Sequence, residues 1–281
     1  MKRTGGLPSP ALPGRTFPPY IAPVAHSSAY GALLIEGGDV VLPDRVVESG
    51  VVLISGGKIL FAGPAENLPD PLPPHCRKIE VAGALVCPAL WEPHIHGCGG
   101  FSTENGTRDS LLGIAKYLAS CGVGAFVPTV VAEVGSLASL GEALESPGCP
   151  QELAGRVPGI HVEGPFVAPS RRGGIPERLM APISLDYLGR LVALARGRIR
   201  VMTFAPELEG ANALADRLSA MGILPSLGHS DARLEDLSRY EQVSPLCVTH
   251  LFNGMSGVSH KEPGLAQWAL LNRDLIAGGP R

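Results

Sequence analysis

The chain is 281 residues long, with 45% apolar residues, 17% charged residues and a formal net charge of −3. It lacks the basic excess of nucleic-acid-binding proteins, so no nucleic-acid partner is expected. No apolar run reaches the roughly 18 residues of a membrane-spanning helix, and no apolar segment follows Lys2 and Arg3 as it would in a secretory signal, so no membrane partner is expected.

The cysteines indicate a reducing compartment. They are scattered at positions 76, 87, 98, 121, 149 and 247, without a C-x-x-C pair. In a long chain without a secretory signal, this pattern predicts buried thiols and not a disulfide framework. The expected location is therefore the cytoplasm.

The first third of the chain divides into two parts. Residues 1–29 are rich in Pro, Gly and Ser without any period, which predicts a flexible N-terminal extension. Residues 30–84 contain short β-rich runs separated by Gly-Gly and Pro-Asp turns, which predict a small antiparallel β domain, the N-terminal part of a β-sandwich. Four or five strands are too few for an independent sandwich. Its apolar faces are therefore expected to stay partly exposed.

Residues 85–281 alternate between strands and helices. The strands are expected at 124–129, 159–162, 200–204, 223–227 and 246–249, and the helices at 108–120, 136–145, 185–196, 210–221, 231–240 and 265–271. This alternation predicts a parallel sheet with crossover helices, either doubly wound or a (β/α)₈ barrel. Polar residues at the ends of many successive strands favour the barrel. The predicted fold is thus α/β, a metal-dependent (β/α)₈ TIM-like barrel with a small N-terminal β-sandwich portion.

The strand count falls short of a closed barrel. About six strands are well marked by their apolar runs, and Asp274-Leu-Ile-Ala predicts the opening of a seventh. A closed (β/α)₈ barrel needs eight strands. The barrel is therefore expected to be incomplete, without its last strands.

Four short segments place metal-ligand residue types at the ends of apolar runs. Glu163 follows the run 157–162, His229 and His250 follow two later strands, and His94 and His96 are spaced so that both imidazoles lie on one face of a strand. Each has another interpretation. Glu163 could be paired with an arginine, His229 could cap a helix, His250 could be a core histidine, and His94 with His96 could be a chance pair in a loop. Their joint placement predicts a centre for Zn²⁺ or a similar divalent ion. For His161, a hydrogen-bonded inner-layer residue is predicted instead.

Six motifs carry a resemblance to a known family. They are HIHGCGG (94–100), HVEGPFVAPSRRGG (161–174), TFAPE (203–207), SLGHSDA (226–232), THLFNGM (249–255) and HKEPG (260–264). In order and spacing they resemble those of the N-acetylglucosamine-6-phosphate deacetylases of the amidohydrolase superfamily. The resemblance runs from about residue 31 to about residue 278.

The resemblance implies roles for individual residues. Glu163, His229 and His250 would bind the catalytic metal, with His94 and His96 as a possible second site. Gly174, Asn253, Gly254 and Lys261 would contact substrate, with Lys261 at the position of a phosphate-binding arginine that often crosses a subunit interface. Zn is the favoured ion, with Fe, Co or Mn as alternatives. A small amino-sugar phosphate is the implied partner, and the complete protein is implied to be a homodimer.

The implied reaction is metal-dependent hydrolysis of N-acetyl-D-glucosamine 6-phosphate to D-glucosamine 6-phosphate and acetate, in amino-sugar catabolism. Three departures from the family pattern bear on it. Ile175 replaces a common histidine, and Lys261 replaces the arginine. The aspartate that ends barrel strand eight has no counterpart, so no catalytic acid–base residue is assigned. A C-terminally truncated member with poor catalysis is therefore expected.

Two alternatives remain open at this point. One is a truncated, non-catalytic remnant that binds metal or sugar phosphate. The other is a different amidohydrolase that acts on a cyclic amide. A substrate panel separates the enzymes, and a thermal shift with glucosamine 6-phosphate beside a turnover assay separates an enzyme from a remnant.

Overall fold

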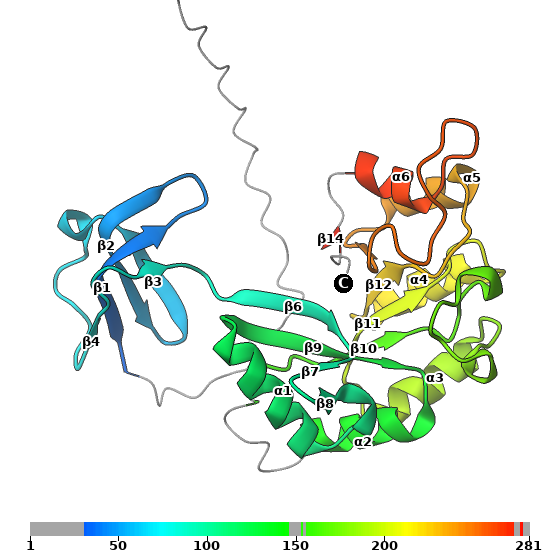
Figure 1. Ribbon diagram of the computed structural model, residues 1–281, viewed down its shortest axis with the longest axis horizontal. Helices are drawn as coiled ribbons and strands as arrows, with labels where there is room; N and C mark the ends of the chain where they lie inside the picture. Colours follow the sequence, from blue (N-terminus) through cyan, green and yellow to red (C-terminus); the bar gives the residue numbers. More distant parts are fainter. Residues whose placement is uncertain (1–30, 146–152, 154–155, 273–275, 278–281) are drawn as a thin grey trace, which may run out of the picture.

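The computed structural model describes residues 31–145, 153, 156–272 and 276–277. The extension expected at 1–29 lies outside the described residues. The described part contains two large sheets and a two-stranded β7–β8 sheet, and the two large sheets stand apart in Figure 1, connected by the segment that leads into β6. No described helix is long and apolar enough to cross a membrane.

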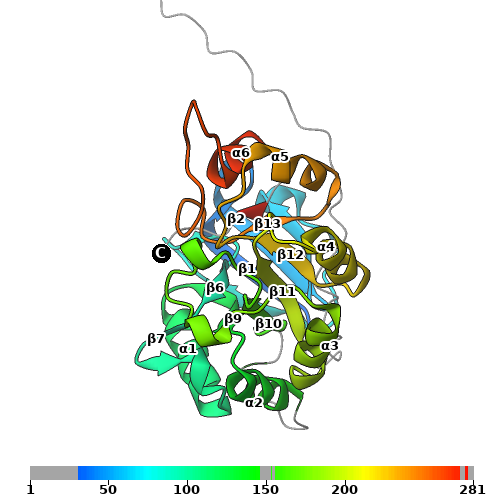
Figure 2. The same ribbon diagram turned by 90° about the vertical axis from the view of Figure 1, so that its right-hand side faces the viewer.

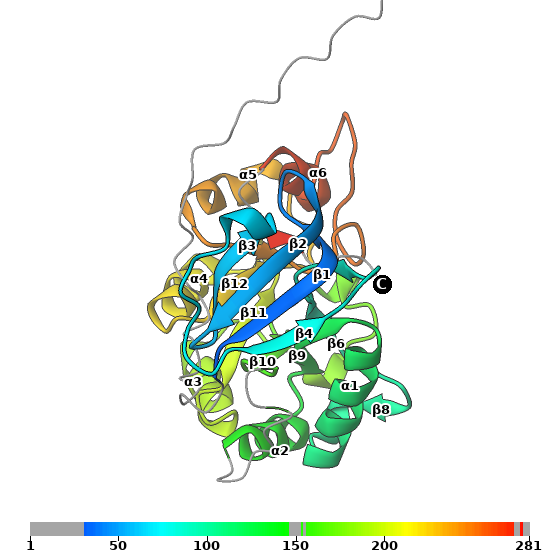
Figure 3. The ribbon, with the colours of Figure 1, turned by 90° about the vertical axis from the view of Figure 1, so that its left-hand side faces the viewer.

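The smaller sheet contains five strands from the first part of the chain. They are β1 (Leu33–Val41), β2 (Val46–Ser55), β3 (Lys58–Gly63), β4 (Arg77–Glu80) and β5 (Leu85–Val86), with β3, β2, β1 and β4 side by side and β5 also paired with β1. Figure 3 shows this sheet in front of the larger one. Val46, Ile59 and Leu60 are more than half exposed, as the strand count predicts.

The predicted antiparallel arrangement is correct for β1, β2 and β3 but wrong for β4, and β5 joins this sheet from just beyond the predicted boundary at residue 84. Both of these strands pair with β1 in parallel. The reason is the long connection after β3, which contains a short 3₁₀ helix at Ala65–Asn67 and carries the chain to the far side of β1. A parallel pair requires such a crossover because a tight turn cannot return the chain in the same direction.

The larger sheet is parallel throughout and curled. Its strands lie in the order β6 (Leu90–Ile95), β9 (Val123–Val131), β10 (Ile160–Glu163), β11 (Ile199–Phe204), β12 (Leu224–Leu227), β13 (Cys247–Val248) and β14 (Ile276–Ala277). Within the described part of the chain, β6 and β14 are not paired with each other, so the sheet is an open portion of a barrel. The predicted fold class is therefore confirmed, including a strand after residue 274.

Helices cover the outer side of the curled sheet (Figures 1 and 2). They are α1 (Arg108–Ser120), α2 (Val134–Glu145), α3 (Leu185–Leu194), α4 (Ala211–Ala220), α5 (Leu234–Leu237) and α6 (Leu265–Leu271), with a β7–β8 hairpin (Gly97–Cys98 and Phe101–Ser102) before α1. Thr107 and Ser184 cap α1 and α3 by accepting backbone N–H groups. In α1 the buried residues Leu111, Ile114, Ala115 and Leu118 have helical spacing and face the sheet.

Two expectations from the sequence need correction. The helix expected at 231–240 is α-helical only in α5, followed by a 3₁₀ turn at Ser238–Gln242, because Asp231 is held in loop contacts described below. No disulfide joins the five described cysteines, but only Cys247 is buried. Cys87 directly follows β5, and Cys121 directly follows the last residue of α1. Both are exposed at the surface.

Gly141 marks a close approach between α2 and the end of α3. A Cβ added there would lie 2.8 Å from Leu194 O and from Ala195 C. Alanine raises helix propensity by about 1 kcal/mol, but a clash with backbone costs about 1–3 kcal/mol. Gly141→Ala is therefore expected to lower the free energy of unfolding.

Gly189 in α3 provides the matched control. It is exposed, and nothing lies within 4 Å of an added Cβ. Gly189→Ala is expected to stabilise the protein by about 0.5–1 kcal/mol. The urea concentrations at the unfolding midpoints of the two variants should therefore shift in opposite directions from the parent value. Equal shifts would contradict the close packing at Gly141.

Candidate metal centre and active site

Five polar side chains converge at the C-terminal edge of the curled sheet. His94 and His96 lie at the end of β6, Glu163 is the last residue of β10, and His229 and His250 follow β12 and β13. Parallel strands place all their C-terminal ends at one edge, which is where barrel enzymes keep their reactive groups. The structure thus brings together the residues that the sequence singled out separately.

Glu163 is at the centre of this cluster. Its Oε1 lies 3.0 Å from His229 Nε2 and 3.0 Å from His250 Nε2, and its Oε2 lies 2.8 Å from His96 Nε2. The fourth imidazole, that of His94, has its Nε2 3.6 Å from Oε1. Two sets of potential ligand atoms result, each within 4.8 Å: Glu163 with His229 and His250, and Glu163 with His94 and His96.

The orientation of the two later histidines fits a cation. The Nδ1 of His229 lies 2.8 Å from Arg171 O, and the Nδ1 of His250 lies 2.9 Å from Asn253 O. A carbonyl accepts, so each neutral imidazole carries its proton on Nδ1 and presents the Nε2 lone pair inward. The two Nε2 atoms are 3.0 Å apart. Two lone pairs beside a carboxylate repel one another, and a divalent ion among them removes that repulsion.

Electrostatics keep Glu163 in its charged form. Burial raises the pKa of the Glu163 carboxyl, but without a bound ion, N–H groups of the His229, His250 and His96 imidazoles directed at it hold the pKa well below its usual range. A divalent ion between the carboxylate and the Nε2 lone pairs would take the place of those protons. An ionised carboxylate is the form that binds a metal.

His161 has the inner-layer role predicted from the sequence. It is buried, its Nε2 lies 2.7 Å from Thr203 Oγ1, and burial lowers its pKa to about 4. The Thr203 hydroxyl is also hydrogen-bonded to the Thr249 hydroxyl, which in turn is hydrogen-bonded to Ser226 Oγ. These side chains link β10, β11, β12 and the end of β13 beneath the cluster. His161, Thr203, Thr249 and Ser226 are all buried.

Backbone strain coincides with the cluster. His229 has φ of 49° and His250 has φ of 31°, in the left-handed region that non-glycine residues rarely adopt. Such conformations cost about 1–3 kcal/mol each and persist where surrounding contacts enforce them, often at functional sites.

The cluster forms the floor of a cavity of about 330 Å³. Its lining residues are His94, His96, Val131, Glu163, Gly173, Gly174, Ile175, His229, His250, Asn253 and Gly254. Gly174, Asn253 and Gly254, which the resemblance implies as substrate contacts, are thus among the residues that line the cavity. Lys261 does not line this cavity and is exposed on the loop before α6. The sequence analysis missed Val131, although an apolar residue ending a strand is a usable signal.

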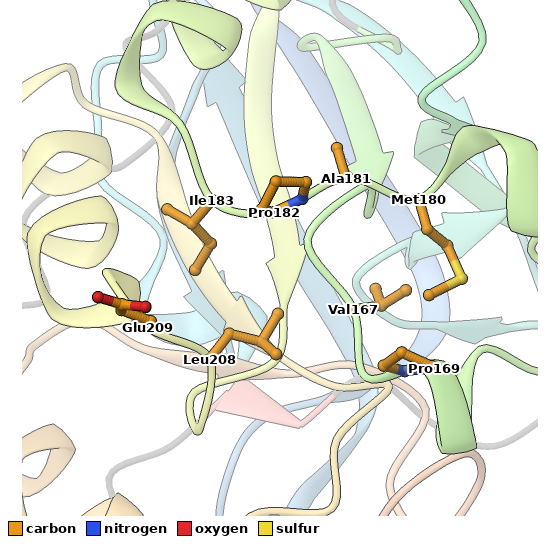
Figure 4. Close-up of a pocket in the computed structure, with 8 residues that line it drawn as sticks. All are labelled: Val167, Pro169, Met180, Ala181, Pro182, Ile183, Leu208 and Glu209. Atoms are coloured by element: carbon orange, nitrogen blue, oxygen red, sulfur yellow. The ribbon is translucent and has the colours of Figure 1, made fainter.

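A neighbouring apolar cavity of about 390 Å³ shares the loop that follows β10. Its lining residues are Val167, Pro169, Met180, Ala181, Pro182, Ile183, Leu208 and Glu209 (Figure 4). None of them is a predicted ligand. The second cavity therefore contributes no residue to the predicted metal centre.

Glu207, in the loop after β11, is a second carboxylate close to the centre that the sequence analysis did not assign. Burial raises the pKa of Glu207. It accepts hydrogen bonds from Ser230 Oγ and from the Asp231 backbone N–H. The signal available in the sequence is a carboxylate after an apolar strand, as for Glu163.

Known proteins resemble this chain in sequence and in fold. The N-acetylglucosamine-6-phosphate deacetylase of Bacillus subtilis is 31% identical over 257 residues, which cover 88% of this chain and 64% of that protein. The N-acetylgalactosamine-6-phosphate deacetylase of Escherichia coli O157:H7 is 31% identical over 202 residues, 69% of this chain and 53% of that protein. No protein-family model matches the chain.

A solved structure agrees with these relatives. The N-acetyl-D-glucosamine-6-phosphate deacetylase of Mycobacterium smegmatis, in complex with N-acetyl-D-glucosamine-6-phosphate, superposes with a TM-score of 0.73 at 23% identity, covering 88% of this chain and 63% of that one. The curated relatives of this chain in sequence are N-acetylglucosamine- and N-acetylgalactosamine-6-phosphate deacetylases. The family predicted from the motifs is thereby confirmed, and it is favoured over an amidohydrolase acting on a cyclic amide. The chain spans about 64% of the length of its Bacillus subtilis relative.

Proposed function

We propose that this chain carries the metal centre of an N-acetylglucosamine-6-phosphate deacetylase. The activity would be hydrolysis of N-acetyl-D-glucosamine 6-phosphate to D-glucosamine 6-phosphate and acetate. The convergence of Glu163, His229 and His250 on one point of a cavity supports this most directly. The names of the relatives supply the substrate class.

In this proposal Glu163, His229 and His250 hold the catalytic ion, and His94 and His96 share Glu163 with a second one. Imidazole and carboxylate donors favour Zn²⁺, and Fe, Co or Mn accept the same donors. When bound, such an ion would supply Lewis-acid activation of water and of the amide carbonyl.

The chain's own residues bind and orient the substrate. Gly173 and Gly174 present bare backbone to the cavity, so the sugar can approach closely, and Asn253 and Gly254 face it from the loop after β13. Positioning of this kind lowers the barrier by holding the acetamido group near the reactive atoms. Among the described lining residues the one carboxylate is Glu163, so the proposal assigns no acid–base residue.

Phosphate recognition is assigned to Lys261, and the proposed assembly is a cytoplasmic homodimer. Lys261 is exposed and lies outside the cavity of its own chain. This position fits a cation that a neighbouring subunit offers to the phosphate. A lysine gives a point charge where a guanidinium would give a two-pronged contact.

An acetate-release assay tests the activity. Protein of known metal content is given N-acetyl-D-glucosamine 6-phosphate, its galactosamine epimer and the unphosphorylated sugar, and the first is expected to react fastest. Chelation should abolish the reaction, and added metal should restore it. No acetate at full metal occupancy, together with a thermal shift by glucosamine 6-phosphate, would favour the non-catalytic alternative.

The second ion leads to a separate prediction. His96→Ala removes the imidazole nearest Glu163 Oε2 but leaves the pair His229 and His250 intact. Metal analysis should therefore show stoichiometry falling from above one ion per chain to about one, because only the weaker site loses a ligand. Unchanged stoichiometry would remove His96 from the metal centre.

The proposed contact between Lys261 and the phosphate leads to another prediction. Lys261→Ala should raise KM for the phosphorylated sugar about tenfold, because a hydrogen bond to a charged group contributes about 1.5–3 kcal/mol. KM for the unphosphorylated sugar should change little, and Lys261→Arg should retain most affinity. Equal effects on both sugars would exclude Lys261 from phosphate binding.

A further inference from the structure

The direction of the His229 imidazole depends on two separate loops. Its main chain, at φ of 49°, is held by Ala168 N–H donating to His229 O at 2.8 Å. Its ring is held by Nδ1 donating to Arg171 O at 2.8 Å. The lone pair on Nε2 therefore points inward only if the loop at Arg171 and the turn at 229–231 keep a fixed relative position.

Glu207 fixes the turn from one side. Its Oε1 accepts the Asp231 backbone N–H at 2.6 Å, and its Oε2 accepts the hydroxyl of Ser230 at 2.8 Å. Ser230 Oγ in turn accepts the Ala232 N–H at 2.9 Å. Both carboxylate oxygens of Glu207 thus bind the two residues that directly follow His229.

Asp231 transmits this restraint to the second loop. Its carboxylate accepts from Ser170 Oγ and from Arg171 Nε. Arg171 is also the residue whose carbonyl receives His229 Nδ1. The contacts therefore close into a ring: Glu207 to Ser230 and Asp231, Asp231 to Arg171, and Arg171 back to His229.

We propose that Glu207 is a positioning residue that sets the direction in which His229 presents Nε2 to a bound metal ion. Glu207 does not line the cavity, so it acts through Asp231 and Arg171 and not on substrate. The inference rests on the proposed metal centre and adds a residue outside its five predicted ligands. Partners that orient a ligating histidine typically alter metal affinity about 10–100-fold when they are lost.

Glu207→Gln tests the proposal. The amide keeps the shape of the side chain, but only its one oxygen still accepts, so it can hold either the Asp231 N–H or the Ser230 hydroxyl as a donor and not both. Glu209→Gln is the matched control, since Glu209 is exposed in the same loop and is one of the residues lining the apolar cavity of Figure 4. The readouts are Co²⁺ affinity by chelator competition, the visible spectrum of the Co²⁺-loaded protein, and Tm of the metal-free protein.

Glu207→Gln is expected to bind Co²⁺ about 10–100-fold more weakly and to shift the Co²⁺ spectrum, with Tm of the metal-free protein close to the parent value. Glu209→Gln should match the parent in all three. Parent-like affinity and spectrum in Glu207→Gln would overturn the proposal, as would a lower Tm with an unchanged spectrum, or equal losses in both variants. If Glu207→Gln fails to fold, Asp231→Asn breaks the next link and is judged by the same readouts.

These measurements contain no substrate, so they separate the inference from the proposed activity. Parent protein that binds Co²⁺ but releases no acetate contradicts the deacetylase activity and leaves the role of Glu207 standing. Parent protein that binds no Co²⁺ overturns both.

Discussion

Glu163→Gln is expected to lower the affinity for divalent metal by more than about 100-fold, beyond the loss typical of an outer partner. The carboxylate contacts His229, His250, His96 and His94, so it is common to both groups of ligand atoms. An amide has no negative charge and replaces one ligating oxygen with an NH₂ group that cannot bind a cation. Both candidate ions should therefore be lost together.

Elemental analysis after dialysis at fixed free metal measures this effect. Glu142→Gln is the control, because Glu142 is exposed on α2 and is not among the residues that line the cavity. The control should retain parental occupancy. If Glu163→Gln kept the same occupancy as the control, the assignment of Glu163 as the shared ligand would be wrong.

Phe204→Ala is expected to lower the free energy of unfolding by about 3–5 kcal/mol. Phe204 ends β11, is fully buried and lies with its ring centroid 6.3 Å from that of Tyr240. Truncation removes buried apolar surface and leaves a cavity that the rigid sheet cannot close. Since stability of a domain is typically about 5–15 kcal/mol, this is a large fraction of the total.

Urea unfolding followed by circular dichroism measures the change, with Phe252→Ala as control. Phe252 is 57% exposed, and surface substitutions usually stay within about 0.5 kcal/mol. Similar losses in the two variants would show that burial at Phe204 does not determine stability.

The sequence alone determined the large features of the barrel portion. The alternation of apolar strands and amphipathic helices is a local pattern, and a parallel sheet follows from it because crossover helices are needed. Residues at the C-terminal ends of such strands must meet at one edge, so the sequence alone places Glu163, His229 and His250 together. The motifs then identified the family that the relatives confirm.

Other features depended on contacts between segments far apart in the chain. β4 and β5 pair in parallel with β1, because the connection after β3 crosses to the far side of the sheet. The helix expected from residue 231 begins only at Leu234, since the Asp231 backbone and side chain are bound by Glu207 and Arg171. Helix propensity contributes a fraction of a kcal/mol per residue, and such contacts override it.

The supporting contacts of the site belong to the tertiary structure as well. The sequence shows that Glu207 follows an apolar strand, but only the fold places its two oxygens on Ser230 and Asp231. Likewise, only the fold shows that Lys261 lies outside the cavity of its own chain. The ligands could be read from the sequence because strand ends share an edge by construction. Their orientation could not, because it depends on hydrogen bonds between loops whose relative position no local pattern encodes.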